Sequence, residues 1–148
     1  ISYFDKIIIS PGPGLPVDAG ISVEFVKRYY VEKSILGICL GAQAIAVALG
    51  CELFNLTDVM HGKKTKINIL DQEDVIYKTL PKHIFVGRYH SWAINLSSNN
   101  DLIPTALDEY QTLMSFRHSL YPVFGIQYHP ESILTEFGQK ILKNWLNN

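Results

Sequence analysis

A cysteine between two glycines is the residue in this sequence most suited to nucleophilic chemistry. The segment GICLG, with Cys39 at its centre, has the glycine-x-nucleophile-x-glycine form of a sharp strand-to-helix turn that exposes the middle side chain. The start of a helix stabilises an anion through its dipole and its unpaired N–H groups, so this position favours a thiolate, which attacks carbonyl carbons. The alternative is a small buried apolar cysteine, because free cysteines are among the most buried residues.

A base for this thiol is expected at a strand end on the same edge of the sheet. His129 directly follows the apolar run FGIQY, and Glu131 stands two residues further on, so in extended geometry both side chains project the same way. The carboxylate can then orient the imidazole. Taken singly, a strand-end histidine bonded to backbone and a first-turn carboxylate are the ordinary interpretations. Together with Cys39 they predict a triad for acyl transfer.

Acyl chemistry also needs hydrogen-bond donors for the oxyanion that forms. The amide of Leu40 is in position for this, and a glycine of the loop PGPG at 11–14 is a second candidate. The same loop lacks a phosphate-binding glycine pattern. The other histidines show no paired spacing, and two cysteines are too few for a disulfide scaffold, so neither a metal site nor a disulfide is expected.

Alternating strand and helix signals must position these residues. A buried strand at 6–10 is followed by a helix with Asp18 as its N-cap, and a second strand at 34–38 is followed by a helix at 40–49 that ends at Gly50. This repeat predicts an α/β fold in which helices flank an open, mostly parallel sheet.

The middle of the chain has a different texture. Between 51 and 116, short runs (ELFNL, TKINIL, HIFVG, LIPTAL, TLMSF) alternate with polar turns, which predicts an additional, short antiparallel sheet or mixed pairing. A further strand at 123–128 leads to a final amphipathic helix with Thr135 as N-cap. With 148 residues and no linker, the chain is expected to form one domain, residues 1–148.

Composition excludes several classes of partner. The net charge of −1 argues against nucleic acid, and 47% hydrophobic with 18% charged residues is ordinary globular composition. The apolar stretch at 35–51 contains Gln43 and is shorter than the ~20 residues of a membrane span. No secretory signal is visible, so a cytoplasmic protein with free thiols is expected.

Five segments together resemble the class I, triad-type glutamine amidotransferases, which have a flavodoxin-like fold. In chain order they are SPGPG at 10–14, GICLGAQ at 37–43, MHGK at 60–63, RYHS at 88–91 and GIQYHPES at 125–132. The forms MHGK, RYHS and HPESILT are most similar to the glutaminase components of anthranilate synthase and aminodeoxychorismate synthase.

The resemblance implies a glutaminase that delivers ammonia to a chorismate-using synthase subunit, which makes anthranilate in tryptophan biosynthesis. Cys39 would attack the glutamine side chain to form a γ-glutamyl thioester, with His129 as acid and base and Glu131 orienting it. Gly14 and Leu40 would supply the oxyanion amides. The implied glutamine-binding residues are Gly12, Pro13, Gly14, Leu40, Gln43, Ser91 and Trp92, the last two through their main chain. No cofactor is expected in this subunit, and any magnesium requirement belongs to the partner.

Three departures from the family pattern stand out. Ala42 replaces a common His or Met, Trp92 replaces a common Leu, and a strand, helix and strand that relatives carry before this point are expected to be missing here. Alternatives remain for the function: the aminodeoxychorismate branch, one glutaminase serving both partners, a non-catalytic binding subunit, or a thiol hydrolase of γ-glutamyl peptides.

Overall fold

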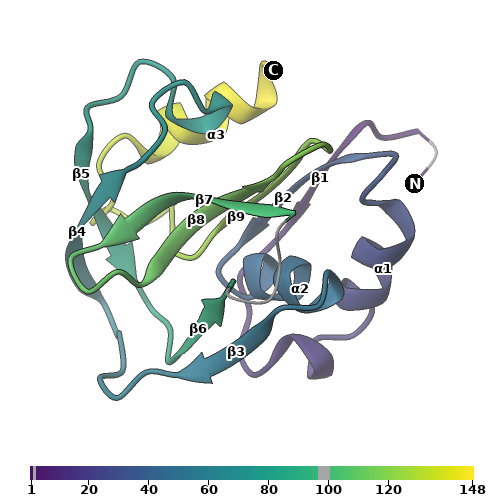
Figure 1. The fold of residues 1–148 in the computed structure, drawn as a ribbon, viewed down its shortest axis with the longest axis horizontal. Coiled ribbons are helices and arrows are strands. Elements are labelled where there is room, and N and C mark those ends of the chain that lie inside the picture. The colour runs from purple at the N-terminus through teal and green to yellow at the C-terminus, as the bar shows by residue number, and fades with distance from the viewer. Residues whose placement is uncertain (2, 97–100) are drawn as a thin grey trace.

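A mixed seven-stranded sheet organises the molecule in the computed structural model, which describes residues 1, 3–96 and 101–148 (Figure 1). The strand order is β1-β2-β9-β8-β7-β4-β5, and β3 pairs with β6 in a second, two-stranded sheet. The strands are β1 Lys6–Ile9, β2 Ser34–Ile38, β3 Glu52–Asn55, β4 Lys63–Ile69, β5 His83–Arg88, β6 Trp92–Asn95, β7 Leu102–Asp108, β8 Leu113–His118 and β9 Val123–Ile126. The helices are α1 Ser22–Tyr29, α2 Leu40–Ala48 and α3 Gly138–Leu146, with 3-10 turns η1 Pro16–Asp18 and η2 Val75–Tyr77.

Parallel pairing, expected across most of the sheet, is limited to β1, β2 and β9. The remaining neighbours pair antiparallel. For the pairs β7–β8 and β8–β9, the short connections at 109–112 and 119–122 explain this, because a parallel pair needs a crossover of a dozen or more residues. The α/β architecture and the additional two-stranded antiparallel sheet are confirmed, and the parallel part is the part that leads to Cys39.

Both faces of the sheet are buried along β2. Ile35 of β2 packs in the cluster with α1 and α2, and the next residue, Leu36, packs in the cluster with α3 and η2. Successive strand residues point to opposite faces, so a strand covered on both sides must be largely apolar, as β2 is from Ile35 to Ile38. Figure 1 shows α3 above the sheet and α2 below it.

Three local predictions need correction. The strand β1 is half-exposed rather than buried, because it lies at the edge of the sheet. The first long helix begins after Ile21, since Pro16 starts a 3-10 turn in which Asp18 is the last residue. The last helix begins after Phe137, whose left-handed φ of 58° turns the chain, and Thr135 has another role described below.

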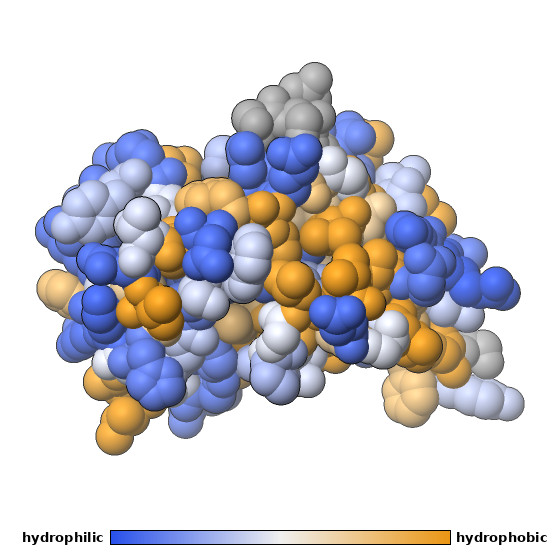
Figure 2. Space-filling model, turned by 90° about the horizontal axis from the view of Figure 1, so that it is seen from below, coloured by the Kyte–Doolittle hydropathy of each residue, from blue (hydrophilic) through white to orange (hydrophobic). Residues whose placement is uncertain are grey.

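Figure 2 views the molecule from the β3 side of Figure 1. Figure 2 shows apolar side chains gathered near the middle of this face, with hydrophilic side chains interspersed. Within the described ranges, every helix is too short or too polar to cross a membrane.

Candidate active site

Cys39 lies at the turn between β2 and α2 with an unfavourable backbone conformation. Its φ of 52° and ψ of −106° are outside the regions that non-glycine residues commonly adopt. Such strain costs on the order of 1–3 kcal/mol and persists only where the surroundings enforce it. The main-chain N–H of Cys39 donates to the Ile126 carbonyl at 2.7 Å, which ties the turn to the end of β9.

The two glycines around Cys39 are required by close packing. A Cβ on Gly37 would collide with the backbone of Gly41, and a Cβ on Gly41 would collide with the carbonyl of Ile9 in β1. The helix α2 therefore approaches β1 and β2 more closely than any side chain allows. This close approach places the N-terminus of α2 directly beneath the cysteine, as the motif predicts.

A cavity of about 120 Å³ opens above this turn. Eight of the residues predicted from the sequence line it: Gly12, Pro13, Gly14, Cys39, Leu40, Gln43, Ser91 and Trp92. Tyr89 and His90 complete the wall. The loop after β1, the start of α2 and the segment before β6 thus converge on one hollow, which we call the Cys39 pocket.

His129 and Glu131 follow β9, beside the strand that leads to Cys39. The carboxylate of Glu131 is 2.7 Å from Nδ1 of His129, the arrangement expected for an oriented imidazole. Nε2 of His129 is buried and has no hydrogen-bond partner in the described part of the chain. The Tyr89 ring packs edge-on against the imidazole at 4.9 Å between centroids, so His129 adjoins the wall of the Cys39 pocket.

The sulfur of Cys39 has a different partner. It accepts a hydrogen bond from Nε2 of Gln127 at 3.8 Å, and within residues 1, 3–96 and 101–148 no hydrogen bond joins it to His129. Burial, and then the negative charge of Glu131, raise the pKa of the thiol to about 11, while the Leu40 N–H and the Gln127 amide act in the opposite direction. In this structure Cys39 is a neutral thiol at physiological pH.

The segment that contains His129 is bound to the outer edge of β5. The N–H of His129 donates to the Gly87 carbonyl at 3.0 Å, and the Gly87 N–H donates to the Thr135 hydroxyl at 2.9 Å. The same hydroxyl donates to the His129 carbonyl at 2.5 Å. Thr135 is therefore a clamp between β5 and the histidine, which explains why it is not the cap of α3.

A buried ion pair fixes the protonation of His90. Arg88 bonds to Asp108 at 2.6 Å and donates from Nε to Nε2 of His90 at 3.1 Å. Nε2 therefore has no proton, and Nδ1 donates to the Trp92 carbonyl at 2.8 Å. Burial and the Arg88 charge lower the pKa of His90 to about 4, so the imidazole is neutral at pH 7.

Three residues of the site were not predicted individually: Tyr89, His90 and Gln127. Tyr89 and His90 belong to the RYHS segment, but histidine spacing alone gave no reason to select His90. Gln127 could have been found by the signal that selected Gln43, because it is the one polar side chain in the apolar run FGIQY. A buried amide needs partners, and these two side chains bond to each other at 3.1 Å.

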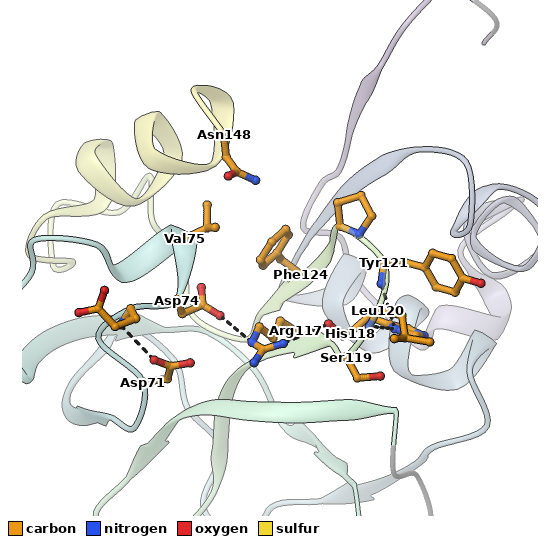
Figure 3. A pocket seen from close by; sticks show the side chains of 12 residues that line it. Asp71, Asp74, Val75, Arg117, His118, Ser119, Leu120, Tyr121, Phe124 and Asn148 are labelled. Carbon is orange, nitrogen blue, oxygen red and sulfur yellow. Dashed lines mark hydrogen bonds and ion pairs between the residues drawn. The ribbon is translucent and has the colours of Figure 1, made fainter.

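A larger cavity, of about 410 Å³, lies at the opposite end of β9 (Figure 3). It is lined by Asp71, Glu73, Asp74, Val75, Arg117, His118, Ser119, Leu120, Tyr121, Pro122, Phe124 and Asn148. Figure 3 shows Asp74 pointing toward Arg117, 3.5 Å away, and burial raises the pKa of this carboxyl to about 6. None of the residues predicted for the site lies here. In the described part of the chain, no three His, Cys, Asp or Glu side chains lie close enough to hold a metal ion.

Comparisons with known proteins agree with this geometry. The family model "Glutamine amidotransferase class-I" matches residues 1–148. The chain is 43% identical to anthranilate synthase component 2 of Pyropia yezoensis, covering 96% of this chain and 75% of the relative. It is 39% identical to aminodeoxychorismate synthase component 2 of Escherichia coli, covering 96% and 75%.

A solved structure gives the same answer at the level of the fold. A Thermoplasma acidophilum protein described as one component of GMP synthase superposes with a TM-score of 0.85 and 28% identity. The superposition covers 97% of this chain and 71% of that one. With a small pocket above the Cys39 turn, an adjoining His–Glu pair and a family match over all 148 residues, the chain belongs to the class I glutamine amidotransferases.

Proposed function

We propose that this glutamine amidotransferase hydrolyses glutamine through a thioester on Cys39 and delivers the ammonia to a chorismate-using synthase subunit that makes anthranilate. The observation that supports this most strongly is the convergence of Cys39, the residues predicted for glutamine binding and the His129–Glu131 pair at one edge of the sheet.

In the proposed reaction, Cys39 gives its proton to Nε2 of His129 and its sulfur attacks the side-chain amide carbon of glutamine. The N–H groups of Leu40 and Gly14 donate to the oxyanion that forms. The C–N bond then breaks while His129 returns the proton to nitrogen, so ammonia leaves and the γ-glutamyl thioester remains. A water molecule deprotonated by His129 attacks the thioester, glutamate leaves and the thiol is restored.

The proposed reaction requires Cys39 and His129 to come into hydrogen-bond contact when substrate binds. Nε2 of His129 is buried without a hydrogen-bond partner among the described residues, so it is available to accept the thiol proton. Hydrogen bonds at catalytic sites are often long or unformed in the free enzyme and tighten in the substrate complex. Every step uses side chains and main-chain groups of this chain, and we propose no cofactor for this subunit.

Gln43 supplies an acceptor to the substrate in this proposal. Its Nε2 donates to the Trp92 carbonyl at 2.9 Å and to Gln127, so both N–H bonds are used within the protein. The carbonyl oxygen Oε1 is then the atom of Gln43 that is left for a ligand. An acceptor at this position suits the ammonium group of an amino acid substrate.

The choice of partner follows from the relatives. Component 2 of anthranilate synthase and component 2 of aminodeoxychorismate synthase are both similar to this chain, at 43% and 39% identity. Other relatives named for anthranilate synthase are only 37% identical, so identity does not rank the two partners. Anthranilate is proposed first because more of the relatives are named for it. The second candidate is the aminodeoxychorismate branch or one glutaminase that serves both synthases.

The variant Cys39→Ser tests the proposal in the complex with a chorismate-using subunit. We expect it to abolish product formation from glutamine and to leave formation from ammonium chloride unchanged, because the partner uses ammonia directly. Cys51→Ser is the matched control, since Cys51 is also buried but does not line the Cys39 pocket. Equal loss of both activities in Cys39→Ser would contradict this division of labour. Anthranilate and aminodeoxychorismate are distinguished by analysing the product.

A further inference from the structure

Gln127 stands between the nucleophile and the side chain that is proposed to bind substrate. It directly follows β9 and is 1% exposed. Its Oε1 accepts from Nε2 of Gln43 at 3.1 Å, and its Nε2 donates to the sulfur of Cys39 at 3.8 Å. The reaction proposed above assigns no role to this residue.

Trp92, Gln43, Gln127 and Cys39 are joined by a series of hydrogen bonds, and each bond in the series fixes the donor and acceptor of the next. The Trp92 carbonyl can only accept, so the Gln43 atom facing it must be Nε2. That nitrogen can only donate, so the Gln127 atom facing Gln43 must be Oε1. The nitrogen of Gln127 must therefore face the sulfur, so the hydrogen-bond partners alone fix which end of the Gln127 amide is the nitrogen.

The surroundings of the sulfur make this donor important. Glu131 places a negative charge nearby, which disfavours a thiolate, and burial disfavours it further. The groups that favour the thiolate in this structure are the Leu40 N–H and the Gln127 amide. A hydrogen bond to an ionised group is about twice as strong as one between neutral groups, so the Gln127 bond strengthens when the sulfur ionises.

We propose that Gln127 stabilises the Cys39 thiolate by hydrogen bonding and couples it to the glutamine pocket through Gln43. The coupling to the glutamine pocket rests on the proposed function, whereas the stabilisation of the thiolate does not. A substrate group that binds Gln43 fixes the Gln43 amide, and this in turn holds the Gln127 nitrogen against the sulfur. Arg88 and His90 act as positioning residues, because Arg88 holds His90 and His90 holds the Trp92 carbonyl, to which Gln43 is bonded.

Two substitutions separate the stabilisation of the thiolate from the coupling to Gln43. Gln127→Glu keeps an acceptor for Gln43 and removes the donor to sulfur, whereas Gln127→Met keeps the volume and removes both bonds. The rate of Cys39 alkylation by iodoacetamide is measured from pH 7 to 11 by mass spectrometry of the Cys39 peptide. Glutamine hydrolysis with the partner subunit gives kcat and KM. Gln111→Glu, in the exposed turn between β7 and β8, is the control with the same charge change.

In both Gln127 variants we expect the alkylation rate between pH 8 and 10 to fall by about 10- to 100-fold, because a smaller fraction of the thiol is ionised at each pH. The KM for glutamine should rise in Gln127→Met and change little in Gln127→Glu, because only the former loses the bond to Gln43. Gln111→Glu should match the wild type throughout.

An unchanged alkylation profile in folded Gln127→Met, which removes the donor without adding a charge, would overturn the stabilisation, and equal KM values in the two variants would overturn the coupling. If neither variant folds, the side-chain amide resonances of Gln127 in the wild type decide, since they must shift as Cys39 ionises and would stay fixed if the bond were absent. Alkylation needs no glutamine turnover, so a failure of the proposed function would be recognised separately.

Discussion

At the scale of single residues, the surroundings of Cys39 keep its thiol protonated. Cys39 is buried beside the Glu131 charge, and its pKa of about 11 keeps the sulfur protonated at neutral pH. In the proposed reaction Glu131 thus has two opposing effects, because it would orient His129 as the base while its charge disfavours the Cys39 thiolate.

Replacement of Glu131 by Gln should separate these two effects. Removing the negative charge lowers the pKa of Cys39, so we expect alkylation of the thiol at pH 8 to become faster. We expect kcat for glutamine to fall by about 10²-fold or more, because the imidazolium formed during the reaction loses its charged partner. Glu109→Gln, on the surface, is the control. If the alkylation rate and kcat both rose or both fell in Glu131→Gln, the two opposing roles of Glu131 would be contradicted.

The residues of the site were largely predictable because each has an unusual sequence setting. Cys39 stands between glycines, and Gln43 interrupts an apolar run. The position of these residues in one cavity is observed, and the catalytic roles of Cys39, His129 and Glu131 remain predictions. Gln127 and His90 were missed because their importance comes from hydrogen bonds between distant segments, which spacing in the sequence does not reveal.

At the scale of elements, the site depends on how closely α2 lies against the parallel strands. Gly37 and Gly41 allow this contact, and the Cys39 turn is bonded to β9. The second strand–turn–helix unit was predictable almost to the residue, because strand, glycines and helix stop are all local signals. The start of α3 was not, because Thr135 bonds across to β5 rather than to its own helix.

Gly41→Ala is expected to destabilise the protein through this contact. The added Cβ would collide with the backbone of Ile9, which cannot rotate away, so α2 must shift from β1. We expect the free energy of unfolding in urea to fall by about 1–3 kcal/mol or more. Gly12→Ala is the matched control for stability, because its Cβ would meet the flexible end of the Leu40 side chain and should cost less. Equal losses in the two variants would contradict this explanation.

At the scale of the whole molecule, the two ends of the parallel strands differ in character. The Cys39 pocket lies at one end, and the cavity around Asp74 and Arg117 lies at the other. The α/β class was predictable from alternating strands and helices. The extent of antiparallel pairing was not, because strand neighbours in a sheet depend on contacts between segments far apart in sequence.

The buried carboxyl of Asp74 should make stability depend on pH. Its pKa of about 6 is higher than in the unfolded chain, so the native state binds the proton more tightly. This contribution is fully present below about pH 4 and is lost as the pH rises through 6, in total on the order of 3 kcal/mol. The difference in unfolding free energy between wild type and Asp74→Asn, measured in urea from pH 4 to 7.5, should show this loss. Asp58→Asn, at an exposed position, should differ from wild type by a constant amount.

The attachment of the His129 segment to β5 has a consequence for solubility. β5 is the last strand of the sheet, and its backbone groups at Phe85 and Gly87 are bonded by His129, Thr135 and Glu136. An uncovered outer strand is a template on which other chains can pair. Release of the segment at 129–136 would therefore expose the unpaired backbone of β5 and displace the His129 imidazole. We expect aggregation to accompany the loss of activity.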